Sequence, residues 1–265
     1  MVEYFTIHFP KSDRDVRIEV SRPRVLDGIT FDTLYLLDGQ NAFRDTHAAF
    51  GRSIRATKAL AFAAKEMNKR IIGIAIHNMG SEKGRVSEYT PFHIENEESK
   101  RFESENLEVC YNYCFDFVNT LIPYIEKKYP VYKDPSHRFI YGSSLAAITA
   151  LYISFTYKDT FNYIGSFSTA SFLFENAFYD FLNKNIDNTK KIFLYVGKKE
   201  KSDSMYIEDT YYKSALNLYN YLKDNNYKLR FVVDPNGYHN EESWDKHLLE
   251  YINFIYSEDI IYSPK

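Results

Sequence analysis

The sequence has little of several residue types, and each scarcity excludes a class of protein. It contains two cysteines in 265 residues, too few for a disulfide-stapled scaffold or a cysteine-based zinc site. No apolar run approaches the length of a membrane span, and the first fifteen residues lack the basic and apolar regions of a secretory signal. An excess of positive charge is also lacking: the net charge is −3, which gives no electrostatic case for binding nucleic acid or an anionic membrane surface. We therefore expect a cytoplasmic protein that binds neither nucleic acid nor a membrane.

The two cysteines belong to a helical pattern and predict no chemistry. Cys110 and Cys114 stand four residues apart on one expected helix face, a spacing at which disulfides are rare. No histidine or further cysteine completes a metal site around them. We expect two reduced core thiols and no metal ion.

Short apolar runs alternate with helical patterns along the chain. Alternation predicts two antiparallel edge strands at Val2–Phe9 and Asp15–Val20. Continuous apolar runs predict strands buried on both faces of a sheet, at Thr33–Leu37, Arg70–Ile76, Phe139–Tyr141, Tyr163–Phe167, Lys191–Val196 and Leu229–Val233. Helices are expected at Ser53–Asn68, Asn106–Tyr129, Asp209–Asn225 and Glu241–Tyr256. This alternation predicts an α/β fold in a single domain, residues 1–265, with a mostly parallel sheet between two helical layers.

The least regular stretch is residues 77–105, which follows a buried strand. Long irregular connections in compact domains are more often functional than idle, and ligands bind at the carboxyl edge of such sheets. The acidic run in this segment is typical of a solvated loop. Arg85, Tyr89 and Phe92 are better candidates for a substrate pocket.

Chemistry is concentrated in the stretch RFIYGSSLAA, residues 138–147. An apolar strand reaches Gly142, Ser143 and Ser144, and an alanine-rich helical run follows. This is the layout of a nucleophile elbow, a tight strand–turn–helix corner that projects a serine hydroxyl above the sheet. Small residues are required two positions before and after the serine because the chain packs tightly on itself there. A serine that merely caps a helix would look similar.

Two further pieces follow in the order serine, acid, histidine, which is the order of the α/β-hydrolase triad. Glu200 stands on the loop after the strand KIFLYV, and His239 on the loop after LRFVV. Alone, Glu200 reads as a solvated loop charge and His239 as a turn residue beside Asn236-Gly237. The three together predict a catalytic triad of Ser144, His239 and Glu200.

With these pieces in place, about residues 30–257 resemble the putative-esterase family of α/β-hydrolases. The family includes esterase D-like thioesterases, feruloyl and acetyl-xylan esterases, and enterochelin-type siderophore esterases. The resemblance rests on blocks that occur in family order: LYLLDGQNAF, IIGIAIHN, RVSEYTPF, the elbow with its helix and next strand, LYVGKKE and GYHNEESW. It implies an α/β-hydrolase fold and hydrolysis of a small-molecule ester.

Two departures from the family pattern concern the site. Ala146 and Ala147 stand where the family usually has glycines, which favours oxygen esters over the thioesters of the esterase D-like members. The family acid is usually aspartate, so Asp203 is the alternative to Glu200.

The expected chemistry is acyl transfer from an ester to Ser144 and then to water, with no metal or organic cofactor. Oxyanion donors are expected to be the backbone N–H groups of Leu145 and Gln40, with Asn41 as the alternative to Gln40. Ser168 and Trp244 are further candidates for the pocket wall, although Trp244 also suits core packing. An acyltransferase on the same fold, or a non-catalytic scaffold that binds a ligand or partner, remains as an alternative function.

Overall fold

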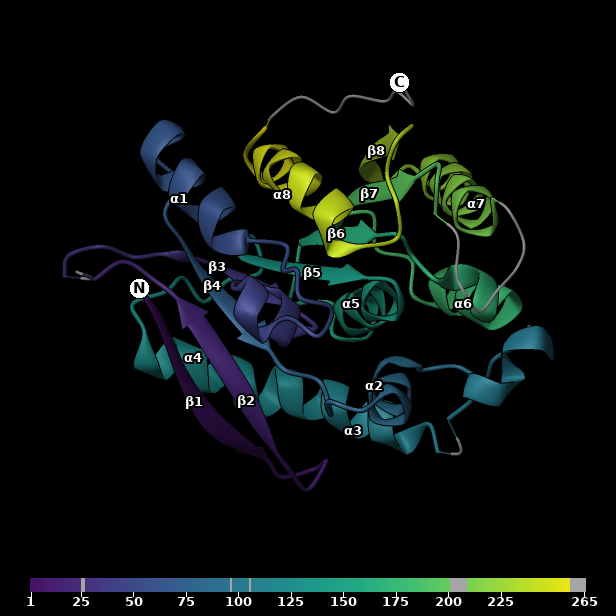
Figure 1. The fold of residues 1–265 in the computed structure, drawn as a ribbon, viewed down its shortest axis with the longest axis horizontal. Coiled ribbons are helices and arrows are strands. Elements are labelled where there is room, and N and C mark those ends of the chain that lie inside the picture. Colours follow the sequence, from purple (N-terminus) through teal and green to yellow (C-terminus); the bar gives the residue numbers. More distant parts are fainter. Residues whose placement is uncertain (25–26, 96, 105, 201–208, 258–265) are drawn as a thin grey trace.

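Eight strands form one sheet in a computed structural model that describes residues 1–24, 27–95, 97–104, 106–200 and 209–257. The order across the sheet is β1-β2-β4-β3-β5-β6-β7-β8 (Figure 1). The strands are β1 (Val2–Phe9), β2 (Arg14–Ser21), β3 (Asp32–Leu36), β4 (Ile71–Ile76), β5 (Arg138–Ser143), β6 (Tyr163–Phe167), β7 (Lys191–Gly197) and β8 (Lys228–Asp234). The first two pair antiparallel with each other, and β2 pairs antiparallel with β4. All pairings from β4 to β8 are parallel.

In the described ranges, eight α-helices and several short helical turns connect the strands. The α-helices are α1 (Ala56–Glu66), α2 (Glu82–Tyr89), α3 (Glu108–Asp116), α4 (Ile122–Lys128), α5 (Leu145–Thr156), α6 (Glu175–Lys184), α7 (Thr210–Asp224) and α8 (Glu241–Tyr256). The 3₁₀ turns are η1 (Gly39–Asn41), η2 (Asp45–His47), η3 (Glu97–Phe102) and η5 (Ser171–Leu173), and η4 (Phe117–Leu121) is a π-helical turn between α3 and α4. No helix in the described part of the chain is long and apolar enough to cross a membrane.

The alternation of side chains along the central strands creates two separate cores. Leu34 and Leu36 of β3 pack in the core that also holds the apolar faces of α1 and α8, which lie side by side (Figure 1). Tyr35 points to the opposite face, into the larger core that holds the buried side chains of α2 to α7. A strand covered on both faces must be apolar throughout, which is why these runs are continuous in the sequence.

The parallel sheet and the antiparallel edge pair confirm the predicted α/β architecture. Cys110 and Cys114 are buried free thiols, as expected, with sulfur atoms 3.9 Å apart. Two helices were not predicted. The segment expected to be irregular contains α2, whose first turn is capped by Ser81 accepting a hydrogen bond from the Gly84 amide. The helix α6 lies between β6 and β7, where no element was expected.

The predicted helix over residues 106–129 is divided in the structure. It runs as α3, the π-helical turn and α4, with Pro123 at the start of the last. Proline has no N–H to donate to the preceding turn, which accounts for a change of winding just before it.

Because β3, β5, β6, β7 and β8 are parallel, the loops that follow them meet at one edge of the sheet. Those loops carry Asp38, Ser144, Ser168, Glu200 and His239. Ligands bind at this edge in open α/β sheets.

Candidate active site

Ser144 occupies the corner between β5 and α5. Its backbone has φ 59° and ψ −124°, a region that costs a residue other than glycine about 1–3 kcal/mol. The corner is held in place by a hydrogen bond from the Ser144 amide to the Phe167 carbonyl of β6, at 2.9 Å. Ser144 is partly exposed, whereas Gly142, Ser143 and Leu145 are buried. The strained corner therefore presents this hydroxyl at the carboxyl edge of the sheet.

The corner is closed by contact between the end of the strand and the first turn of the helix. A Cβ atom on Gly142 would lie 2.2 Å from the Ala146 carbonyl oxygen, and 2.7 Å from the Ala147 nitrogen. Both contacts are with backbone, which cannot move aside as a flexible side chain does. Glycine is therefore required at position 142, while alanine is accommodated, fully buried, at 146 and 147.

We expect Gly142→Ala to lower the melting temperature by about 5–10 °C, because the methyl group forces the elbow open. Thermal unfolding followed by circular dichroism measures this. Ala147→Gly is the matched control, since it removes a methyl group from the same corner and costs about 1 kcal/mol of helix propensity. Equal melting temperatures for Gly142→Ala and the wild type would show that the corner does not need this close contact.

Glu200 and His239 face each other beyond the ends of β7 and β8. A Glu200 carboxylate oxygen, Oε2, lies 3.0 Å from Nδ1 of His239. The other oxygen, Oε1, accepts hydrogen bonds from the Ser168 hydroxyl at 2.6 Å and from the Gly197 amide at 2.7 Å. Glu200 is 4% exposed. A buried carboxylate with both oxygens engaged is fixed in orientation, so this side chain is not a solvated loop charge. Asp203, the alternative acid, lies outside the described residues.

The acid loop and the histidine loop are joined by their backbones. The Lys198 amide donates to the Asp234 carbonyl and the Lys199 amide donates to the Gly237 carbonyl, at 2.8 and 2.9 Å. A Cβ atom on Gly197 would lie 2.3 Å from that same Gly237 oxygen. Gly197 at the end of β7 and Gly237 on the histidine loop therefore allow the approach that places Glu200 against His239.

The ring of His239 is enclosed by aromatic side chains. Trp244 meets it edge-on at 5.2 Å, and the Trp244 indole N–H donates to the Ser168 hydroxyl at 2.8 Å. The ring of Tyr211 also packs on the imidazole, at 4.2 Å and tilted by 34°. The structure thus places Ser168 and Trp244, both predicted for the pocket wall, in the shell that supports the acid and the histidine. Tyr211 was missed because its position on α7 carries no motif.

An oxyanion donor needs a backbone N–H that is not already hydrogen-bonded, and the candidates differ in this respect. Leu145 begins α5, and the first amides of a helix have no partner within the helix. Gln40 lies in the first turn of η1, where the same rule applies, but the Asn41 amide already donates to the Asp38 carbonyl at 2.8 Å. The Asn41 side chain is also engaged, with Glu241 and the Ala49 amide. These contacts favour Gln40 over Asn41 as the second donor.

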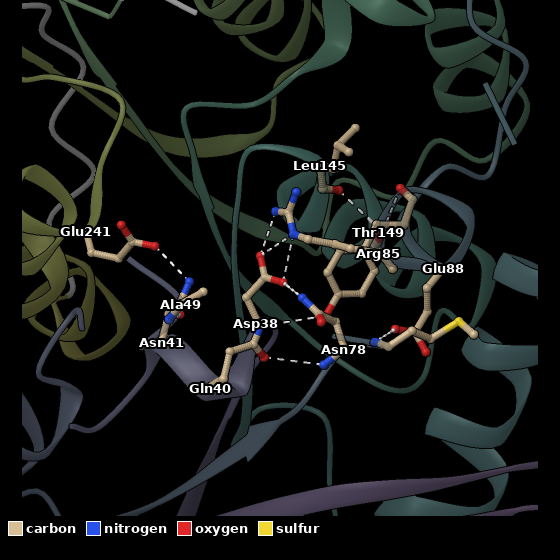
Figure 2. A network of polar contacts seen from close by, with 12 residues as sticks. Asp38, Gln40, Asn41, Ala49, Asn78, Arg85, Glu88, Leu145, Thr149 and Glu241 are labelled. Atoms are coloured by element: carbon tan, nitrogen blue, oxygen red, sulfur yellow. Dashed lines mark hydrogen bonds and ion pairs between the residues drawn. The ribbon is translucent and has the colours of Figure 1, made fainter. Parts of the chain in front are cut away.

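Figure 2 shows the polar network that holds the loop after β3, which carries Asp38 and Gln40. Asp38 lies in the left-handed region at φ 53°. Its carboxylate accepts a bifurcated hydrogen bond from Arg85 Nε, at 2.9 and 3.1 Å to its two oxygens, and a second bond from Nη2 at 2.6 Å. Asn78 donates to the same carboxylate at 2.6 Å. The Tyr89 hydroxyl accepts from the Asp38 amide at 3.0 Å. Arg85 and Tyr89, expected in the pocket, thus fix the loop that carries Gln40.

Phe92 lies apart from this network, in an aromatic cluster. Its ring centroid lies 5.5 to 6.3 Å from those of its neighbours, which are Tyr152, Phe174, Phe178 and Phe181.

A cavity of about 620 Å³ lies at the amino ends of β3, β5 and β6, and none of the predicted site residues lines it. Among the described residues, no group of three or more His, Cys, Asp or Glu side chains could hold a metal ion.

Comparison with known proteins gives a family match over most of the chain. The family model described as "Putative esterase" matches residues 10–255. The chain is 24% identical to the uncharacterized protein YbbA of Bacillus subtilis (strain 168) over 234 residues, which is 86% of this chain and 87% of that protein.

Solved structures support the same fold. An IroE-like serine hydrolase from Shewanella oneidensis superposes with a TM-score of 0.73 and 15% identity, covering 96% of this chain and 79% of that one. The enterobactin esterase FES from Shigella flexneri superposes with a TM-score of 0.76 and 13% identity, covering 97% of this chain and 58% of that one. The fold of this chain is therefore that of the α/β-hydrolases.

Proposed function

Because the chain belongs to the putative-esterase family, we propose that it is a serine carboxylic-ester hydrolase with Ser144, His239 and Glu200 as its triad. The observation that carries the proposal is the meeting of three loops at one sheet edge. A strained serine stands at a strand-to-helix corner, and a buried carboxylate contacts a histidine 3.0 Å away. The order of these residues along the chain is that of the α/β-hydrolase triad.

In the proposed reaction Ser144 Oγ attacks the ester carbonyl carbon while its proton passes to Nε2 of His239. Glu200 accepts the Nδ1 hydrogen of the imidazole, which keeps Nε2 free to take that proton and stabilises the imidazolium. The negative oxygen of the tetrahedral intermediate binds the amides of Leu145 and Gln40. When the intermediate collapses, the leaving alcohol takes the proton from Nε2. Water then attacks the acyl-enzyme by the same steps and releases the acid.

The surroundings of the triad suit a small-molecule ester. Ser168 donates a hydrogen bond to Glu200, and Trp244 donates one to Ser168. In this proposal they therefore act on the substrate only through Glu200 and His239. The Arg85 side chain is 27% exposed despite its pairing with Asp38, so part of it is available to contact a ligand. We place the substrate between the Arg85 side and the partly exposed Ser144.

The test combines turnover with covalent labelling. Wild-type protein is expected to hydrolyse p-nitrophenyl acetate or butyrate with saturation, and to lose that activity in step with labelling by a fluorophosphonate. Mass spectrometry of the labelled peptides should place one adduct on Ser144. An adduct on another residue, with activity lost in step, would contradict the assignment of the nucleophile. Adding an acceptor alcohol and measuring the ratio of transfer product to free acid separates a hydrolase from an acyltransferase.

A further inference from the structure

A buried side-chain contact joins the loop that carries Gln40 to the start of the helix that follows His239. Nδ2 of Asn41 donates a hydrogen bond to Oε1 of Glu241 at 2.8 Å, between residues 200 positions apart in the sequence (Figure 2). Asn41 is 9% exposed and Glu241 is 6% exposed. A buried hydrogen bond to a carboxylate is stronger than one between neutral groups, and leaving either partner unpaired is costly. The contact is therefore a firm link between two parts of the candidate site.

The direction of the Asn41 amide is fixed by a second contact of the same side chain. Its Oδ1 accepts a hydrogen bond from the Ala49 amide at 2.9 Å, while its Nδ2 faces Glu241. A backbone N–H cannot accept a hydrogen bond and a carboxylate cannot donate one, so only this orientation satisfies both neighbours. Asn41 is therefore the donor toward Glu241, and an aspartate at position 41 would set two carboxylates face to face.

Each end of the link stands next to a group that the proposed reaction uses. Asn41 is the last residue of η1 and directly follows Gln40, the proposed second oxyanion donor. Glu241 is the first residue of α8, two positions after His239. The other polar contacts of the loop after β3 hold it against α2 and the end of β4. The bond from Asn41 to Glu241 instead sets this loop relative to the histidine loop.

The short turn between His239 and α8 is itself tightly held. The Asn240 side chain caps the helix by accepting a hydrogen bond from the Ser243 amide at 3.0 Å. The Ser243 hydroxyl in turn accepts one from the Tyr238 amide at 2.8 Å. Because these bonds lie on both sides of His239, a displacement of the start of α8 is transmitted to the imidazole.

We propose that Asn41 and Glu241 are positioning residues, whose hydrogen bond fixes the oxyanion donor Gln40 relative to the base His239. The inference rests on the proposed function, since both groups act on the same tetrahedral intermediate. The Gln40 amide binds its negative oxygen, while the imidazole transfers its protons. A small misplacement of either group costs a large factor in rate. Asn41 and Glu241 act through these two neighbours and need not touch the substrate.

Asn41→Asp tests the link, because it exchanges the donor for an acceptor of the same shape. The carboxylates of positions 41 and 241 then repel each other and displace the loop that carries Gln40. We expect kcat for p-nitrophenyl acetate to fall about tenfold with KM within about twofold of wild type, since an oxyanion donor acts mainly in the transition state. Arg52 still pairs with Asp245 at 3.0 Å, which keeps the two segments together in the variant.

The reversed pair should recover the activity. In the double variant Asn41→Asp/Glu241→Gln, the glutamine NH₂ group donates to the new carboxylate, so the bond is restored with its direction reversed. We expect kcat to return to within about threefold of wild type. A loss caused by general destabilisation would instead grow when the second substitution is added. Recovery therefore identifies the contact itself as the cause.

A second pair of variants tests the acceptor without adding charge. Glu241→Ala removes the acceptor and should lower kcat about tenfold, whereas Glu241→Gln keeps a carbonyl oxygen for Asn41 and should stay within about threefold of wild type. Asn176→Asp is the matched control for the first variant. Nδ2 of Asn176 donates to Glu95 at 2.7 Å in the first turn of α6, so the same change beside a glutamate occurs outside the candidate site.

The outcomes separate this inference from the proposed function. If Ser144→Ala abolishes turnover while Asn41→Asp and Glu241→Ala keep full kcat, the inference is overturned and the function stands. A loss in Asn41→Asp that Glu241→Gln does not reverse also overturns it, as does an equal loss in Asn176→Asp. Unfolding curves recorded with the kinetics detect a purely structural role, which lowers the melting temperature at unchanged kcat. Should Ser144→Ala remain as active as wild type, the proposed function fails and the inference falls with it.

Discussion

Ser144→Ala is expected to lower kcat for p-nitrophenyl esters by a factor on the order of 10⁶, because the triad acts as a unit and the remaining groups cannot form an acyl-enzyme. The backbone conformation and the packing around this serine are not those of an ordinary loop residue. Its backbone, at φ 59°, is held by the hydrogen bond from its amide to the Phe167 carbonyl, and its neighbours are packed so tightly that Gly142 cannot bear a methyl group. Steady-state kinetics on acetate and butyrate esters measure the loss.

The adjacent serine supplies the matched control. Ser143→Ala removes a hydroxyl one residue away, at the end of β5, and should leave kcat within about twofold of wild type because Ser143 is not part of the triad. His239→Ala should cost about as much as Ser144→Ala, and the double variant should be no slower than either single one, since effects within a triad are not additive. Losses that multiply in the double variant would contradict a shared function for the two residues.

The sequence predicts those parts of the fold that bury apolar surface in a regular pattern. Strands such as β3 and β5 are covered on both faces, so all of their residues are buried. Such a strand can be recognised in the sequence as a largely continuous apolar run. The helix α2 has no such pattern, because polar contacts stabilise it: Arg85 binds Asp38, and Glu88 pairs with Arg14 at 2.5 Å. Contacts with partners so distant in sequence cannot be inferred from local periodicity.

The candidate site likewise has features that the sequence predicts and features that only the structure reveals. Ser144, Glu200 and His239 each follow a strand that the sequence predicts, and parallel strands bring the following loops to one edge. Two other contacts depend on how separate loops and a helix pack together: the hydrogen bond from Ser168 to Glu200 and the packing of the Tyr211 ring on His239. Such contacts require the three-dimensional arrangement, because no spacing along the chain encodes them.

Glu200→Gln is expected to lower kcat by about 10⁴-fold without loss of fold, the effect of fixing the wrong histidine tautomer in a triad. The two donors behind Glu200 decide how the new amide lies. The Ser168 hydroxyl and the Gly197 amide both donate to Oε1, so the glutamine must place its carbonyl oxygen there. Its NH₂ group then faces Nδ1 of His239 and donates to it. Nδ1 becomes the acceptor, the ring hydrogen moves to Nε2, and the base can no longer take the proton of Ser144.

The same reasoning makes the tautomer measurable and identifies the acid. Nitrogen NMR of the imidazole should show the hydrogen on Nδ1 in the wild type and on Nε2 in Glu200→Gln. In Ser168→Ala combined with Glu200→Gln, the amide loses one of the donors that orient it, so part of the activity lost in the single variant should return. Asp203→Asn is the matched control: it makes the same acid-to-amide change and leaves the Glu200 side chain in place. It should keep kcat within about threefold of wild type. If Asp203→Asn causes the large loss and Glu200→Gln does not, the acid is Asp203, and the buried Glu200 serves only to hold the two loops together.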